Sequence, residues 1–232
     1  KNNIPKQFID FGNWNLFKKT LERINHPIFD SPIISTNKKY LKLIEKFLKK
    51  YQINKYKIIL EPIKKNTAAA ILSSTLIKEI SFQQPVAYFP SDHIIENNKK
   101  FYIETKKNLK KLTDYSISLY GIKPNSPSSK YGYLITRRKK RSLHVSRFVE
   151  KPTHSKAKKL IKNGSLWNSG MVLAKKVSII NNFIAIQPKI LNLSLKSVIK
   201  SKISNNIYKL NKFYYSQIKN ISFDYAILEK CQ

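Results

Sequence analysis

Strand-like and helix-like segments alternate along the first half of this 232-residue chain. Four short apolar runs predict buried strands: 31–36, 56–62, 85–90 and 115–122. Three segments between them have the spacing or composition of helices: 38–51, 66–80 and 97–112. Because parallel neighbours need long crossover connections, the alternation predicts an α/β fold with a mostly parallel sheet and helices on both faces.

The flanking regions continue this pattern less regularly. Residues 5–12 predict a turn and a short strand, and residues 20–24 predict the end of a helix. Residues 130–152 predict two strands joined by the basic stretch 137–141. A helix at 154–163, a strand at 166–174 and further helices to about residue 201 follow. No linker or repeat divides the chain, so we expect one domain over residues 1–232.

The chain carries 45 lysines and arginines against 13 acids, for a formal net charge of +32. Only five of these cations are arginines, and the lysines are spread over most segments. Solvated surface charge is therefore favoured over a nucleic-acid interface, which commonly uses arginine for phosphates and bases. A hydrophobic content of 41% argues against disorder, and one cysteine excludes a disulfide scaffold. Without a membrane-length apolar run or a signal segment, we expect a cytoplasmic protein and no membrane partner.

Acidic residues are scarce, so those at strand ends carry information. Glu61, Asp92 and Glu150 each end or follow a predicted strand. Such positions converge on one rim of an α/β sheet, where ligands bind. Asp92 fits a ligand of Mg²⁺, and it fits equally well a turn-forming aspartate.

Two further segments place polar groups together. Glu150 and Lys151 stand side by side, and in an extended segment they would point to opposite faces. WNSGM at 167–171 could bind a hydroxylated ligand such as a sugar, or form an ordinary turn with Trp167 in the core. His93 lacks an evident partner and favours a structural role over that of a general base. The basic stretch 137–141 favours a solvated hairpin tip.

Nine motifs occur in this order along the chain: PKQF (5–8), ILEP (59–62), NTAAA (66–70), PSDH (90–93), YGI (120–122), YGY (131–133), FVEKP (148–152), WNSGM (167–171) and SFDYAILEK (222–230). The series resembles the bacterial mannose-1-phosphate guanylyltransferases, which are sugar-phosphate nucleotidylyltransferases, over essentially the whole chain. FVEKP followed by WNSGM at this distance is the specific part of the signal. The resemblance implies a three-layer α/β/α nucleotide-binding sandwich, Rossmann-like and of the glycosyltransferase A-like kind.

The resemblance also implies an activity and a set of site residues. GTP and α-D-mannose 1-phosphate would give GDP-mannose and pyrophosphate, with Mg²⁺ as cofactor. The expected catalytic residues are Lys6, Asp92 and Lys151, with Asp92 as the metal ligand. The expected nucleotide side is Glu61, Asn66 and Thr67. The expected sugar side is Gly132, Glu150, Asn168, Gly170 and Asp224.

The sequence departs from the family pattern in three places. The family has a Gly-rich loop ahead of PKQF and a W-S-D-x-G segment after the DYA-x-x-EK stretch, and neither occurs between Lys1 and Gln232. We therefore expect a catalytic domain that is incomplete at both ends and inactive as this chain alone. Lys65 stands where relatives often have an arginine, which keeps the charge but loses the planar fork.

Two rival functions remain. One is a nucleotidylyltransferase for another sugar 1-phosphate or nucleotide. The other is a non-catalytic, basic relative that binds RNA in a salt-sensitive way and releases no pyrophosphate. The expected partners are GTP and mannose 1-phosphate, with no nucleic acid, and a homodimer is left open.

Overall fold

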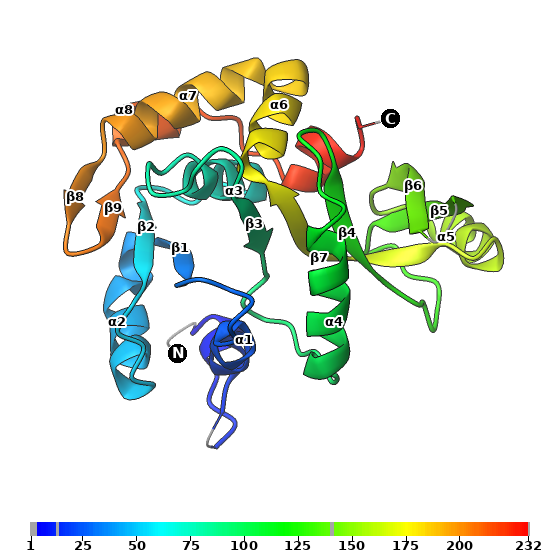
Figure 1. Ribbon diagram of the computed structural model, residues 1–232, viewed down its shortest axis with the longest axis horizontal. Coiled ribbons are helices and arrows are strands. Elements are labelled where there is room, and N and C mark those ends of the chain that lie inside the picture. The colour runs from blue at the N-terminus through cyan, green and yellow to red at the C-terminus, as the bar shows by residue number, and fades with distance from the viewer. Residues whose placement is uncertain (1–3, 13, 140–141, 232) are drawn as a thin grey trace.

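Two sheets lie between helices in the computed structural model, which describes residues 4–12, 14–139 and 142–231. The described strands are β1 (Ile33–Asn37), β2 (Lys57–Glu61), β3 (Pro85–Tyr88), β4 (Ile117–Ile122), β5 (Tyr133–Lys139), β6 (Ser142–Val149), β7 (Leu166–Lys175), β8 (Lys202–Ser204) and β9 (Ile207–Lys209). The helices are α1 (Leu16–Ile24), α2 (Leu41–Lys50), α3 (Thr67–Thr75), α4 (Asn98–Leu109), α5 (His154–Lys162), α6 (Lys176–Ile186), α7 (Pro188–Ile199) and α8 (Lys212–Ser216). The predicted α/β class and the alternation from β1 to β4 are confirmed (Figure 1).

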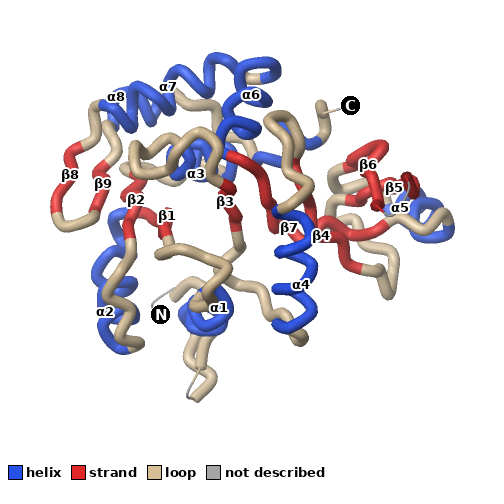
Figure 2. The backbone as a smooth tube through the Cα atoms, in the orientation of Figure 1, coloured by secondary structure: helices blue, strands red, loops and turns tan. Residues whose placement is uncertain are grey.

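The prediction of a mostly parallel sheet is wrong. In the first sheet, ordered β1-β2-β9-β8, the pairs β1–β2 and β2–β9 are parallel. In the second sheet every described pair is antiparallel: β3–β7, β4–β7, β5–β6 and β5–β7. The reason is that β7, which comes late in the sequence, lies between β3 and β4 (Figure 2). It pairs antiparallel with both. Local alternation cannot reveal such an insertion.

Several element boundaries also differ from the prediction. Residues 6–8 form a short 3₁₀ helix rather than a strand, since the Phe8 N–H donates to the Pro5 carbonyl at 2.9 Å. The helix expected over 66–80 ends at Thr75. The strands β8 and β9 and the π-helical turn Asp224–Leu228 were not predicted at all.

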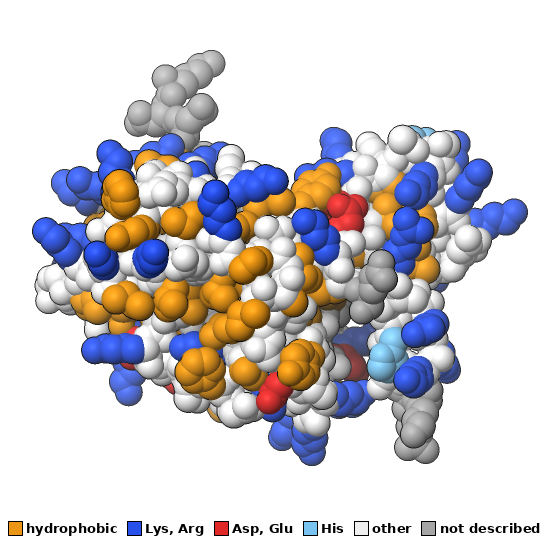
Figure 3. Space-filling view, turned by 90° about the horizontal axis from the view of Figure 1, so that it is seen from above, with side chains coloured by type: hydrophobic (Ala, Val, Ile, Leu, Met, Phe, Trp, Pro, Cys, Tyr) orange, Lys and Arg blue, Asp and Glu red, His pale blue; other side chains and the backbone are white. Residues whose placement is uncertain are grey.

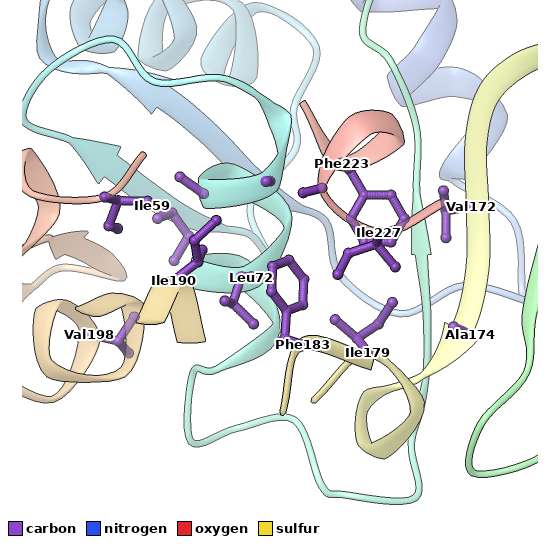
Figure 4. Packing of buried hydrophobic residues seen from close by; sticks show 14 of the residues in the cluster. Ile59, Leu72, Val172, Ala174, Ile179, Phe183, Ile190, Val198, Phe223 and Ile227 are labelled. Carbon is purple, nitrogen blue, oxygen red and sulfur yellow. The ribbon is translucent and has the colours of Figure 1, made fainter. Parts of the chain in front are cut away.

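Alternate residues of β2 face two separate apolar layers. Ile58 packs with the α1 and α2 side, in a cluster that includes Phe17, Ile44 and Leu48. Ile59 lies on the other face, in a cluster that includes residues of α3, α6 and α7 (Figure 4). Both faces of this sheet are therefore covered, which explains why β2 reads as a continuous apolar run.

The larger cluster also fixes the end of the described chain. Phe223 and Ile227 of the C-terminal turn point into the same cluster as Leu72 and Phe183 (Figure 4). This packing holds Asp224, between them, beside the second sheet. Among the described residues, no helix combines the length and the apolar character needed to cross a membrane.

Candidate active site

Lys6 and Asp92 form a close ion pair although they are far apart in the sequence. The Lys6 Nζ lies 2.6 Å from Asp92 Oδ2, and the lysine side chain is mostly exposed while the aspartate is about one-fifth exposed. The short 3₁₀ helix carries Lys6, and the loop after β3 carries Asp92. The exposed ammonium group can donate hydrogen bonds to a phosphate, and the carboxylate beside it can bind a divalent cation.

His93 lies next to this pair but makes no strong hydrogen bond with Asp92. Its Nε2 is 3.7 Å from Asp92 Oδ1. Burial lowers the pKa of His93, although the charge of Asp92 raises it in part, so the neutral form is favoured near pH 7. The structural role expected from the sequence fits these contacts.

Glu150 and Lys151 contact each other, contrary to the prediction that they point to opposite faces. Lys151 Nζ lies 3.5 Å from Glu150 Oε1. Strand β6 ends at Val149, and Lys151 adopts a φ of +42°, so the extended geometry assumed for this segment does not hold. A lysine in this left-handed region is strained, and such strain is concentrated at functional sites.

Asn168 on β7 connects the second sheet to the C-terminal turn. Its Nδ2 donates to Asp224 Oδ1 at 2.8 Å, and its backbone N–H donates to the Gly132 carbonyl at 2.8 Å. A Cβ on Gly132 would lie 2.6 Å from both Glu150 Oε2 and Phe148 Cζ, so a larger residue would displace those side chains. These contacts bring Gly132, Glu150, Asn168 and Asp224 into one group.

The carboxylates of this group are crowded. Burial raises the pKa of Glu150, and the neighbouring charges of Asp224 and Glu229 raise it further, against the opposing effect of Lys151. Burial also raises the pKa of Asp224. Hydrogen-bond acceptors of this kind suit sugar hydroxyl groups, which can donate to them when bound. Acidic side chains are few on the face seen in Figure 3, and some are visible in a hollow of that face.

Gly170 joins this group to the loop that carries Asp92. A Cβ on Gly170 would lie 3.5 Å from Pro90 Cγ, two residues before Asp92, and the residue has a φ of +74°. The Gly170 N–H donates to Asn168 Oδ1 at 3.2 Å. One strand, β7, therefore carries Asn168 of the Asp224 group and pairs with β3, whose following loop carries Asp92.

Glu61 is buried at the end of β2 and is held by nearby polar groups. Its Oε1 accepts from Ser35 Oγ at 2.7 Å, and its backbone carbonyl accepts from Asn37 Nδ2 at 3.3 Å. Burial raises the pKa of Glu61, although the hydrogen bond from Ser35 lowers it in part. Ser35 was not among the site residues predicted from the sequence, because a single serine within an apolar strand does not by itself indicate a functional role.

Asn66 and Thr67 begin α3 and bond to the chain itself. Asn66 Oδ1 accepts from the Thr67 N–H at 2.9 Å, which is the role of a helix cap. Thr67 Oγ1 accepts from the Phe223 N–H at 2.9 Å. The neighbouring Lys65, which stands where relatives often have an arginine, donates to the backbone carbonyls of Ser216 and Ile218. The expected nucleotide side is thus tied to the segment that precedes Asp224.

The structure connects most of the candidate residues through two sets of contacts. Lys6 and Asp92 form one pair, and the loop that carries Asp92 follows β3, which pairs with β7. The second set is linked through the C-terminal turn, by Thr67 on one side and Asn168 on the other. No contact is found between Glu61 and either Asp92 or Glu150 among the described residues. Glu229, whose Oε1 is 3.5 Å from the Glu150 N–H, was not nominated from the sequence.

Residues 2–208 match the family model described as Nucleotidyl transferase. A mannose-1-phosphate guanylyltransferase from Sinorhizobium fredii (strain NBRC 101917 / NGR234) is 31% identical, over 97% of this chain and 45% of that protein. The alginate biosynthesis protein AlgA of Pseudomonas fluorescens is 27% identical, over 99% of this chain and 49% of that protein. The chain spans about half the length of the curated relatives it matches.

Solved structures share the fold. One described as mannose-6-phosphate isomerase from Helicobacter pylori has a TM-score of 0.87 at 26% identity, covering 98% of this chain and 90% of that one. Another, described as mannose-1-phosphate geranyltransferase from Thermus thermophilus, has a TM-score of 0.83 at 21% identity. It covers 100% of this chain and 66% of that one, and at this identity it supports the fold alone.

Proposed function

This chain belongs to the nucleotidyl transferase family, and from this premise we propose that the protein is a sugar-phosphate nucleotidylyltransferase that makes GDP-mannose. In the proposed reaction a phosphate oxygen of mannose 1-phosphate attacks the α-phosphorus of GTP. The bond from that phosphorus to the oxygen that bridges to the β-phosphate breaks, and pyrophosphate leaves with the electron pair. Such a displacement depends on positioning and on charge neutralisation more than on a base.

The observation that carries this proposal is the position of β7 between two chemically different groups. On one side, Asn168 contacts Asp224 among carboxylates suited to hydroxyl groups. On the other side, Gly170 approaches the loop that presents Asp92 and the exposed Lys6. A sugar 1-phosphate needs both kinds of neighbour, because its hydroxyls and its phosphate lie at opposite ends of the molecule.

The residues take the following proposed roles. Lys6 and Lys151 supply compact positive charges for phosphate oxygens. Glu150 and Asp224 accept hydrogen bonds from the sugar, and Gly132 and Gly170 keep the surface free of side chains. Glu61, Asn66 and Thr67 shape the nucleotide side. The relatives named for mannose 1-phosphate and guanylyl transfer support the choice of sugar and nucleotide.

The carboxylate of Asp92 fits one position in the coordination shell of Mg²⁺. Among the described residues, no three histidine, cysteine or acidic side chains gather as a metal site. Mg²⁺ commonly takes one or two carboxylates and completes its shell with water and substrate phosphates. Asp92 would hold the ion in that way, and the bound ion would neutralise phosphate charge.

Asp92→Asn in the full-length protein tests the proposal. The variant keeps the side-chain shape but removes the charge, so we expect Mg²⁺-dependent release of pyrophosphate from GTP and mannose 1-phosphate to fall roughly 100-fold or more. Asp30→Asn, which alters an exposed aspartate elsewhere, is the matched control and should leave turnover unchanged.

The same assay separates the rival functions. Pyrophosphate release with another sugar 1-phosphate or another nucleotide, in preference to mannose 1-phosphate and GTP, would correct the substrate and keep the reaction class. No release with any pair, together with salt-sensitive RNA binding that Asp92→Asn does not change, would contradict the proposed class.

A further inference from the structure

Arginine is distributed unevenly in this lysine-rich chain. Of five arginines, four lie within residues 137–147, where the described ones are exposed on the hairpin of β5 and β6. The fifth, Arg23, lies in the last turn of α1 and is only 2% exposed. Among the described residues the buried charged side chains are Arg23, Lys176 and Glu61, so Arg23 is one of two buried cations.

Arg23 contacts the loop that presents Asp92. Its Nη2 donates to the backbone carbonyl of His93 at 2.7 Å, across 70 residues of sequence. Its Nε and Nη1 are buried and make no hydrogen bond, and no carboxylate pairs with it among the described residues. The single bond to His93 is thus the one polar contact of the guanidinium that the described part of the chain provides.

The backbone of Arg23 is anchored as well. Tyr102 on α4 donates its hydroxyl to the Arg23 carbonyl at 2.8 Å, and the Tyr102 ring stacks on His26 at 3.8 Å between centroids. The position of the guanidinium is therefore set from two helices. Burial lowers the pKa of Arg23, but an arginine stays charged at neutral pH.

We propose that Arg23 is a positioning residue, which holds the backbone of the Asp92–His93 turn so that the Asp92 carboxylate stays at Lys6. The inference rests on the proposed function for its effect on turnover, whereas the contact itself can be tested without turnover. Arginine suits this place better than lysine, since the guanidinium is less strongly hydrated than an ammonium and loses less when it is buried.

Arg23→Lys and Arg23→Met in the full-length protein are the test variants. Both substitutions remove or lengthen the hydrogen bond from the charged guanidinium to the His93 carbonyl, so we expect amide hydrogen exchange over residues 91–95 to accelerate roughly 10- to 100-fold. The Mg²⁺ concentration for half-maximal turnover should rise about tenfold, with a smaller change in the KM for GTP. Arg138→Lys makes the same chemical change on the exposed hairpin and should alter none of these quantities.

The outcomes separate this inference from the proposed function. Faster exchange confined to residues 91–95 supports Arg23 as the anchor of the turn. If the same protein also shows no turnover, that second result counts against the proposed activity and leaves this inference standing. Exchange that stays at the wild-type rate in both variants, or that rises equally throughout the chain, overturns the inference. If Arg23→Met fails to fold, Arg23→Lys decides, and Tyr102→Phe should show a smaller change of the same kind.

Discussion

The nucleotide side and the sugar side of the candidate site use their polar groups differently. Asn66 and Thr67 bond to backbone groups of the chain itself, and Glu61 accepts from Ser35. Around Glu150 and Asp224, by contrast, carboxylates crowd together, and Lys151 adopts a strained backbone conformation. The comparison indicates that the first side is fixed by bonds within the chain, while the second combines crowded carboxylates with a strained backbone.

The largest expected effect lies on the sugar side, at Lys151. Lys151→Ala and Lys151→Gly both remove the ammonium group, so we expect each to lower kcat/KM for mannose 1-phosphate roughly 100-fold. They should differ in stability, because glycine tolerates the φ of +42° and alanine does not. The glycine variant should be more stable than the alanine variant by about 1 kcal/mol in urea unfolding.

Lys158→Ala, which truncates an exposed lysine on α5, provides the control for loss of positive charge. Equal stability of the two Lys151 variants would mean that strain at this position is not a distinguishing property of the sugar side. Unchanged turnover in both would remove Lys151 from the proposed phosphate contacts.

An intermediate effect is expected on the nucleotide side, at Thr67. Thr67→Val keeps the branched shape but leaves the Phe223 N–H without its acceptor. We expect a loss of about 1 kcal/mol in the free energy of unfolding. Thr67→Ser retains the hydroxyl and should lose much less. If Thr67→Val reduces turnover strongly while stability stays the same, Thr67 is a ligand contact and the contrast between the two sides is weaker than described.

The smallest effect concerns the pH dependence of stability at Glu61. The pKa of this carboxyl is higher in the folded chain than in the unfolded chain, because burial disfavours the charged form. The folded state therefore binds more protons between the two pKa values, and the free energy of unfolding falls as the pH rises through that interval. Glu61→Gln removes this titration and should flatten the curve above about pH 4.5.

Denaturant unfolding at a series of pH values provides the measurement, with Glu96→Gln as an exposed control. If the free energy of unfolding of Glu61→Gln has the same pH dependence as that of the wild type, burial of the Glu61 charge does not destabilise the folded state.

The sequence predicted the fold where the pattern is local. The apolar runs and amphipathic segments from β1 to β4 gave the correct succession of elements. The partners of β7 and β9 depend on contacts between segments that are far apart in the sequence, and no periodicity encodes them. The same limit explains the error of parallel strands in the second sheet.

The candidate site was predictable in part. The ion pair of Lys6 with Asp92 joins two motifs that only the family resemblance brought together. The contact of Glu150 with Lys151 was missed because it depends on a left-handed backbone conformation that lysine rarely adopts. Arg23 could have been noticed, since it is the one arginine outside residues 137–147. The remaining residue roles stay predictions.

The pairing of β2 with β9 has a consequence for how this chain is made. Ile58 pairs with Ile207, so the ribosome adds about 150 residues after β2 before its neighbour exists. Until then one edge of an apolar strand presents free N–H and C=O groups, which favours pairing with other nascent chains. Completion of the first sheet must therefore follow translation of β9. A shortage of chaperones during synthesis should reduce the yield of folded protein, whereas molecules that have already folded should keep their stability.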